Sequence, residues 1–173
     1  DPPVQTFRGP LFKTDLNDVL RFLVENVFQR ITKNAGQSVF DLSLADRLPP
    51  VPVNEFVVWE AFEPILQNCV EHAGVQEVRI SIQTRWDPER RESVVTIADN
   101  GNGIAPELLV ADESGIKRIF QEHTSTKSPG AEQAGYGCYI AFEIATQRCG
   151  WKLDAENVAG RGCRFIFTIP QQS

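Results

Sequence analysis

The chain has 173 residues and a formal net charge of −6, with 42% hydrophobic and 23% charged residues. This length and composition predict one soluble globular domain with its own core and leave little room for a second. The negative charge disfavours nucleic acid as a partner, because phosphate backbones bind clustered lysine and arginine side chains. A single anionic nucleotide is still allowed, since backbone amides, local dipoles and a metal ion can hold its phosphates.

The chain shows no targeting or membrane pattern. No apolar run is long enough to cross a bilayer and the N-terminus carries no signal-peptide pattern, so we expect a cytoplasmic protein without direct membrane contact. The scattered cysteines have no Cys-x-x-Cys spacing, which predicts reduced, buried thiols; they are Cys69, Cys138, Cys149 and Cys163. The absence of methionine predicts a piece of a longer protein, monomeric on its own, whose parent is either soluble or membrane-anchored.

The first predicted element is a helix. Residues 1–13 are polar, contain prolines and lack periodicity, which predicts a linker remnant followed by a single domain over residues 14–173. From Leu16 to Ile31 apolar residues recur at helical spacing, with Thr14 or Asp15 as the N-cap.

The middle of the chain predicts a strand, a helix and a hairpin. Residues 38–44 alternate as a strand does, and a second helix is expected over residues 54–73. Pro64 lies within that helix and predicts a kink or a later start. Two β-rich runs, 75–86 and 92–98, are joined by a charged turn and predict a hairpin.

The last third predicts a long loop, a helix and two strands. Residues 101–134 are rich in glycine, serine, threonine and charge, and helical spacing resumes over 137–150. Two further strands are expected over 151–157 and 163–169. Consecutive strands without intervening helices indicate a mixed, mostly antiparallel sheet with helices on one face, which is an α/β two-layer sandwich.

Asp99 is the first candidate for chemistry. It ends a predicted strand and is followed by Gly101 and Gly103, which places a buried acceptor beside backbone that a ligand can approach closely. The alternative interpretation is a simple Asn-Gly turn at residues 100–101.

Asn68 is the second candidate. It lies on the predicted second helix among apolar neighbours, where its amide needs partners. Its carbonyl oxygen suits hydrated Mg²⁺, whereas the alternative is an asparagine that faces water.

Two glycine pairs complete the pattern. Gly135 and Gly137 open a predicted helix, where free amides make an anion site, although a flexible loop end is the plain alternative. Gly160 and Gly162 precede the last strand and, taken alone, predict only a hairpin turn.

In this order and spacing the features resemble the GHKL superfamily of gyrase, heat-shock chaperone, histidine kinase and MutL-type ATPases. The best match is the catalytic domain of sensor histidine kinases, and it covers the chain from about Thr14 to Pro170. The matching segments are Asn68 (N box), residues 99–103 (G1 box), Ile119 and Phe120 (F box), Thr126 and Lys127, Gly135 and Gly137 (G2 box), and residues 160–162.

The resemblance implies a Bergerat ATP-binding fold with a long ATP lid over about residues 104–134, and ATP and Mg²⁺ as cofactors. It implies that Asp99 accepts a hydrogen bond from the adenine amino group and that Asn68 helps to hold Mg²⁺. Glycines of the G1 box would let backbone close over the base, and Gly135 and Gly137 would present amides to the phosphates. The residues assigned to the cofactor are Asn68, His72, Asp99, Gly101, Gly103, Ile104, Phe120, Thr126, Lys127, Gly135, Tyr136 and Gly137.

Within that set, Lys127 is the candidate phosphate contact from the lid, and Arg118 is a second candidate that is equally consistent with a solvated arginine. His72 occupies a position suited to stacking on the base, or it is an ordinary helix-end histidine.

The chain also departs from the family pattern. Glu71 stands where many histidine kinases carry Lys or Arg, Gln133 replaces the first G2 glycine, and His123 replaces an aromatic residue. The gyrase, chaperone and MutL branches place a glutamate general base where this chain has Pro64, so we expect slow or absent ATP hydrolysis. Glu63 is one residue away, about 100° around the helix.

The implied partners follow from the missing phosphoacceptor. Neither His72 nor His123 has the sequence context of a phosphorylated histidine, so the acceptor is expected on a dimerisation and histidine-phosphotransfer domain of the parent protein, with a response regulator as an indirect partner. Two alternatives remain: a nucleotide-sensing pseudokinase or interaction module, and an anti-sigma-type serine kinase.

Overall fold

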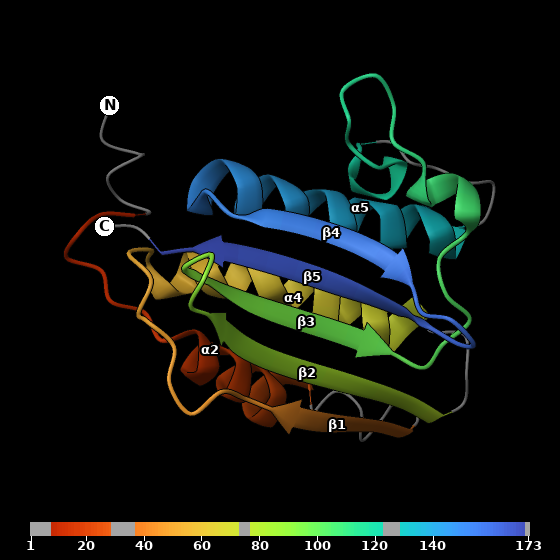
Figure 1. Ribbon diagram of the computed structural model, residues 1–173. Helices are drawn as coiled ribbons and strands as arrows, with labels where there is room; N and C mark the ends of the chain where they lie inside the picture. Colours follow the sequence, from red (N-terminus) through yellow and green to blue (C-terminus); the bar gives the residue numbers. More distant parts are fainter. Residues whose placement is uncertain (1–7, 29–36, 73–76, 123–128, 172–173) are drawn as a thin grey trace.

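The computed structural model describes residues 8–28, 37–72, 77–122 and 129–171 (Figure 1). Its centre is a five-stranded sheet in the order β1-β2-β3-β5-β4. The strands are β1 (Gln37–Ser43), β2 (Glu77–Asp87), β3 (Glu92–Asp99), β4 (Lys152–Asn157) and β5 (Cys163–Pro170). Strands β1 and β2 are parallel and every other neighbouring pair is antiparallel, which confirms the mixed, mostly antiparallel sheet.

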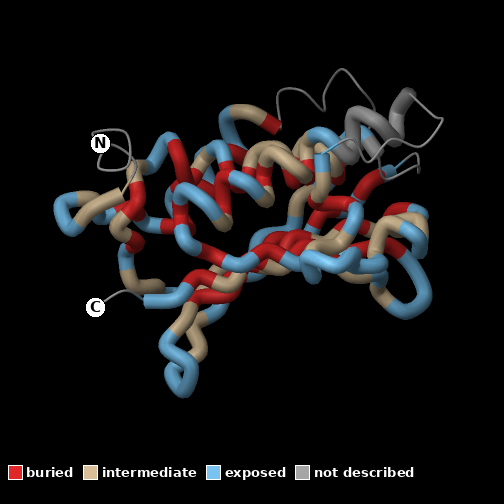
Figure 2. The backbone as a smooth tube through the Cα atoms, turned by 90° about the horizontal axis from the view of Figure 1, so that it is seen from above, coloured by how far each residue is buried: buried red, intermediate tan, exposed pale blue. Residues whose placement is uncertain are grey.

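Helices form the second layer. The described helical segments are α2 (Leu16–Phe22), η1 (Leu23–Phe28), α4 (Glu55–His72), η2 (Pro106–Leu109), η3 (Arg118–Phe120), α5 (Pro129–Glu143) and η4 (Ile144–Cys149). In Figure 1 the long helices α4 and α5 and the shorter α2 lie behind the sheet. In Figure 2 buried residues gather between the helical layer and the sheet, and the two-layer α/β sandwich is confirmed.

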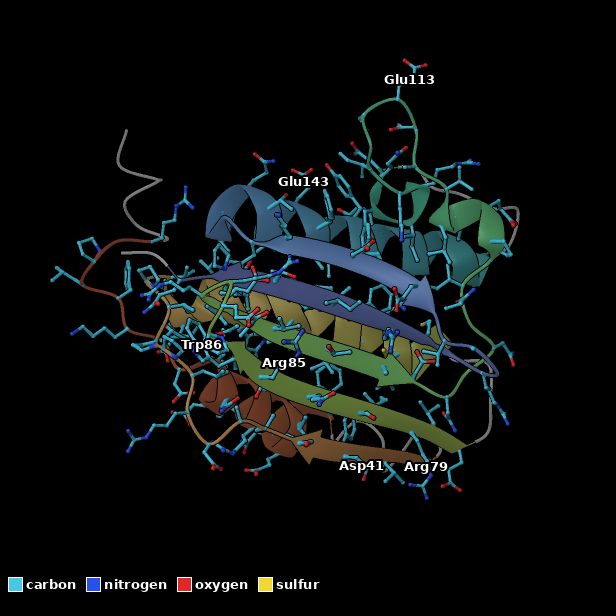
Figure 3. All side chains as sticks on the ribbon, viewed as in Figure 1. Asp41, Arg79, Arg85, Trp86, Glu113 and Glu143 are labelled. Atoms are coloured by element: carbon cyan, nitrogen blue, oxygen red, sulfur yellow. The ribbon has the colours of Figure 1, made fainter. Side chains whose placement is uncertain are left out.

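Buried and exposed residues alternate along the strands, which gives the sheet a core face and a solvent face. In β2, Val78, Ile80 and Ile82 are buried, whereas the residues between them are exposed. On the core face Phe62 of α4 meets Phe167 of β5 edge to face, with ring centroids 4.9 Å apart. The opposite face carries charged side chains such as Asp41, Arg79 and Arg85, which Figure 3 shows as sticks.

Helix α2 begins where the sequence predicts. The Asp15 carboxylate accepts hydrogen bonds from the backbone amides of Asn17 and Asp18, which makes Asp15 the N-cap. Thr14, the other candidate, instead donates its hydroxyl to the carbonyl of Val53 at 2.5 Å. The helix continues through the π-helical segment η1 to Phe28, beyond which the predicted helix leaves the described residues.

The packed part of the chain starts before the expected boundary at residue 14. Arg8 forms an isolated antiparallel bridge with Val53, and Gly9 donates its amide to the carbonyl of Pro52 at 2.9 Å. Thr14 pairs in the same way with Val51. Residues 8–13, expected as linker, therefore lie against the connector that precedes α4.

Two helix starts differ from expectation. Helix α4 begins at Glu55 and continues past Pro64 to His72, so the predicted later start at the proline is wrong. Helix α5, expected from residue 137, already begins at Pro129, and residues 129–134 of the expected lid are helical. Proline is well suited to the first turn of a helix, but the glycines that follow it hide the start from pattern analysis.

No helix in the described part of the chain is both long enough and apolar enough to span a membrane.

Candidate functional site

Asp99 ends β3 on the core face and is 8% exposed. Its Oδ1 accepts a hydrogen bond from the amide of Gly101 at 2.8 Å, and its Oδ2 lies 3.5 Å from the Sγ of Cys163. The carboxylate is therefore buried and accepts hydrogen bonds from the Gly101 amide and the Cys163 thiol. A simple, solvent-exposed Asn-Gly turn does not account for this burial.

Asn100 fastens the chain directly after Asp99. Its Oδ1 accepts from the amide of Arg79 at 2.8 Å, and its Nδ2 donates to the carbonyl of Glu77 at 3.3 Å. These bonds join the start of the loop to the start of β2, so the loop cannot shift without breaking both.

The other end of this loop is held from β4. Gly103 has a φ of +85°, and a Cβ at this position would come within 2.9 Å of the Asn157 Oδ1. Asn157 also brackets the next residue: Ile104 donates its amide to Asn157 Oδ1 at 2.7 Å and accepts from Nδ2 at 2.8 Å. Asn157 was missed by sequence reasoning, because a polar residue at a strand end carries no pattern of its own.

Gly162 brings the start of β5 against Asp99. Its φ is +87°, and a Cβ there would come within 1.9 Å of the Asp99 carbonyl oxygen. The hairpin turn predicted for residues 160–162 therefore leaves out the close contact of Gly162 with Asp99, and only glycine fits at this position. Gly160 also has a positive φ, of +98°, but nothing lies within 4 Å of its added Cβ.

Asn68 lies on α4, one residue before Cys69. Its Oδ1 is buried and has no hydrogen-bond partner among the residues that the structure describes. The neighbouring Cys69 is fully buried, and burial followed by the charge and hydrogen bond of Asp99 raises the pKa of its thiol well above the usual range. Cys69 thus faces the end of β3, and Asn68 is the residue that precedes it on the same helix.

The G2 glycines are not at a helix start. Because α5 begins at Pro129, Gly135 and Gly137 lie inside the helix, where backbone amides bond to preceding carbonyls. A Cβ on Gly137 would make ordinary contact, 3.7 Å, with the carbonyl oxygen of Pro64 on α4. The expectation that these two amides are free at a helix N-terminus is therefore wrong for this conformation.

The aromatic residues of the predicted set have different environments. Phe120 is buried and stacks on Phe142 of α5, with ring centroids 4.9 Å apart, so it belongs to the core beneath the loop segment. Tyr136 is 61% exposed on α5, with its ring centroid 6.4 Å from that of Tyr139. No described contact brings either residue to Asp99.

The first part of the expected lid is attached to β4 through Lys117. The Nζ of Lys117 donates to the carbonyl of Ala155 at 2.6 Å and pairs with Asp154 Oδ1 at 2.9 Å. Ala111 and Lys117 form an antiparallel bridge that closes a small loop, and Glu113 extends from its tip (Figure 3).

Several predicted residues fall outside the described part of the chain. Thr126, Lys127 and His123 lie outside the described residues. His72 is the last residue of α4, but its side chain is not described. Their roles stay predictions.

The fold and the buried carboxylate define a class: an open-sheet α/β domain with a carboxylate enclosed at the end of a central strand. Residues 55–173, more than half of the chain, match the family described as histidine kinase-, DNA gyrase B- and HSP90-like ATPase. The chain belongs to this family, and the resemblance seen in its sequence is confirmed.

Curated relatives within the family are sensor kinases. The chain is 30% identical over 129 residues to the methanogenesis regulatory histidine kinase FilI of Methanothrix harundinacea, which covers 75% of this chain and 13% of that protein. It is 30% identical over 164 residues to the sensor histidine kinase ZraS of Klebsiella oxytoca, covering 90% of this chain and 30% of that protein. The chain thus spans less than a third of each of these two relatives.

Solved structures share the fold. The catalytic domain of histidine kinase ThkA, in a nucleotide-free form, has a TM-score of 0.70 at 23% identity and covers 93% of this chain and 97% of that one. Full-length ShkA in complex with AMPPNP has a TM-score of 0.71 at 19% identity, covering 95% of this chain and 32% of that one. The fold is that of histidine kinase catalytic domains.

Proposed function

We propose that this chain is the ATP-binding catalytic domain of a two-component sensor histidine kinase. The proposal is carried by two features in a chain of this ATPase family: the enclosed Asp99 carboxylate, and the buried Oδ1 of Asn68, which has no partner among the described residues. The buried amide oxygen needs a partner that a ligand can supply, and the carboxylate has lone pairs left for a further donor.

Asp99 supplies the base-binding group. An ionised carboxylate only accepts hydrogen bonds, so it favours a base that presents an amino group, as adenine does, over one that presents a carbonyl oxygen. The two ends of the following loop are fixed by Asn100 and Asn157, which holds the carboxylate in position before the nucleotide arrives.

Asn68 fits a magnesium site. A neutral amide oxygen suits Mg²⁺, and the buried Oδ1 of Asn68 lacks another partner among the described residues. The described residues contain no group of three His, Cys, Asp or Glu side chains that could hold a metal ion, so the nucleotide phosphates and water would complete the coordination. When bound, Mg²⁺ neutralises phosphate charge during phosphoryl transfer.

The chain's own residues favour transfer over hydrolysis. A hydrolase of this family needs a general base for water, and the nearest carboxylate to the expected place, Glu63, accepts a hydrogen bond from Trp59 Nε1 at 2.8 Å. We propose that the acceptor is instead a histidine on a dimerisation domain of the parent protein, that a response regulator receives the phosphoryl group next, and that the monomeric domain works in the cytoplasm.

Glu71 favours a second candidate function, a nucleotide-sensing interaction module without transfer activity. Its carboxylate is exposed on the C-terminal turn of α4, where it accepts a hydrogen bond from Gln67, and its negative charge opposes phosphates. An anti-sigma-type serine kinase differs from the main proposal in the acceptor alone, serine in place of histidine.

Calorimetric titration with ATP, with and without Mg²⁺, tests the proposal. We expect Mg²⁺-dependent binding for the unchanged chain, a loss of affinity of about tenfold or more for Asp99→Asn, and a loss of the Mg²⁺ dependence for Asn68→Ala. Asn26→Ala is the matched control, because Asn26 lies on the surface of η1 and bonds only to the Phe22 carbonyl among its described contacts.

Absence of heat with ATP under both conditions would reject the nucleotide site. Binding without transfer to a supplied histidine-containing dimerisation domain would favour the sensing module. Transfer to a serine of a partner protein would favour the serine kinase.

A further inference from the structure

We propose that an aromatic cavity at the start of α4 binds a small quaternary ammonium ion. The walls of the cavity come from the segment before α2, from α2 itself and from the first turns of α4, and its volume is about 600 Å³. This volume lies in the range of sites for small organic ligands.

The cavity is separate from the proposed nucleotide site. Phe56 and Trp59 line it from the N-terminal turns of α4, whereas Asn68 lies near the C-terminal end of the same helix. At a rise of about 1.5 Å per residue, Phe56 and Asn68 are about 18 Å apart along the helix axis. The proposal therefore goes beyond the proposed function and does not depend on it.

Four aromatic side chains from three elements line the cavity. Phe56 and Trp59 are three residues apart on α4 and so share one face of the helix. Phe22 of α2 packs against Trp59, with ring centroids 5.1 Å apart and ring planes inclined at 53°, and Phe12 comes from the segment before α2. Phe56 is 65% exposed and Phe22 is 48% exposed, so much of each ring is open to solvent. Exposed rings gathered at one cavity indicate a binding site.

Trp59 is held by its own helix. Its Nε1 donates a hydrogen bond to Glu63 Oε2 at 2.8 Å, one turn further along α4. The bond satisfies the only polar group of the indole, so what remains for a ligand is the ring itself. Among aromatic side chains, the indole ring of tryptophan attracts cations most strongly.

The charged residues of the cavity favour a cation. Its lining contains the carboxylates of Asp15, Asp18 and Glu55, and the one cationic side chain among the described lining residues is that of Lys13. Carboxylates and aromatic ring faces both attract positive charge. The ligand is therefore expected to be positively charged.

The hydrogen-bonding state of the carboxylates selects the kind of cation. Asp15 Oδ1 already accepts two backbone amides at the start of α2, and Asp18 pairs with Arg21. A primary ammonium carries three N–H donors and a guanidinium five, each of which needs an acceptor when it leaves water. A quaternary ammonium ion such as choline has no N–H group, so its methyl groups can pack on the rings without losing a hydrogen bond.

Choline and its uncharged isostere 3,3-dimethylbutan-1-ol test the proposal. Two-dimensional ¹H–¹⁵N NMR follows the indole N–H of Trp59, which Trp59→Phe identifies, with Trp86 and Trp151 as internal controls. We expect choline to shift the Trp59 resonance saturably and to bind about tenfold more tightly than the neutral alcohol, because only choline gains from the ring faces and carboxylates.

Two variants assign the effect to the rings and to the charge. Phe56→Leu keeps an apolar side chain and removes one ring, so we expect choline to bind about fivefold more weakly, whereas Phe56→Tyr keeps the ring and should retain the affinity. Glu55→Gln should weaken choline by about threefold at low salt and leave the neutral alcohol unchanged. Unshifted Trp86 and Trp151 resonances check that each variant folds.

Three results would overturn the proposal. Equal affinity for choline and the neutral alcohol would make the cavity merely apolar, and the absence of a saturable shift at millimolar choline would mean that it holds no quaternary ammonium ion. A shift with an arginine-containing peptide but none with choline would make it a docking surface for a partner protein. None of these results bears on the nucleotide site, which the calorimetric titration with ATP tests separately.

Discussion

At the scale of single residues, the site depends on how closely two backbone segments approach each other. The Asp99 carbonyl and Gly162 are in contact, and the left-handed conformation of Gly162 adds a second requirement for glycine. A glycine can thus serve one of two purposes here, freedom of φ or absence of a side chain, and Gly160 provides the comparison because its added Cβ meets nothing within 4 Å.

Gly162→Ala should therefore cost far more than Gly160→Ala. The methyl group at 160 meets only the strain of a positive φ, about 1 kcal/mol, whereas at 162 it must also displace the Asp99 carbonyl, so we expect a loss of about 3 kcal/mol or more. Urea unfolding measures both variants, and ATP titration should show weakened binding for Gly162→Ala alone. Equal losses of stability would contradict the close contact.

Sequence reasoning found the residues whose chemical type is itself informative. Asp99 and Asn68 were identified because a carboxylate at a strand end and an amide among apolar neighbours both need partners. Asn157 and Cys163 were missed as parts of the site, since their importance comes from cross-strand register and from a loop that returns to β4. Register of that kind is a property of the folded sheet and has no local sequence pattern.

At the scale of elements, the sequence predicts some helix starts correctly and others not. Asp15 caps α2 through its own side chain, so the helix start is visible in residue types. Pro64 lies inside α4 without ending it, and α5 begins at Pro129 ahead of the glycines that suggested a later start. Packing of α4 against α5, at Pro64 and Gly137, outweighs local propensity here.

Asp15→Ala should destabilise the domain by about 1 kcal/mol, because two amides at the start of α2 lose their acceptor. Asp18→Ala is the matched control one turn along: its side chain is exposed and, among the described residues, pairs only with Arg21, so we expect about 0.5 kcal/mol or less. Urea unfolding of both variants measures the difference, and similar losses would show that the cap contributes nothing specific.

At the scale of the whole molecule, one hydrophobic layer joins α2, α4 and α5 to the sheet, and all four cysteines are free thiols buried within it. Their predicted reduced, buried state is thereby confirmed. The alternating strands made the sheet predictable, whereas Thr126 and Lys127 lie outside the described residues and their roles stay predictions.

These buried thiols make the stability of the whole domain sensitive to alkaline pH. Burial raises the pKa of Cys138, and of Cys149, from 9.0 to about 12. Above the lower value the unfolded chain has released protons that the folded chain keeps, so stability is complete below about pH 9 and falls as pH rises toward about 12. Each thiol contributes a slope of about 1.4 kcal/mol per pH unit in that window.

Urea unfolding between about pH 8 and pH 10.5, under reducing conditions, measures this slope. Cys138→Ala should reduce the fall by about 1.4 kcal/mol per pH unit, because one proton fewer separates the folded and unfolded states, whatever the variant costs at neutral pH. The comparison of slopes within each protein removes the cost of the small cavity. An unchanged slope in the variant would mean that the Cys138 thiol ionises in the folded core as readily as in the unfolded chain, and the packing of α5 against α4 and the sheet would then be looser than the structure shows.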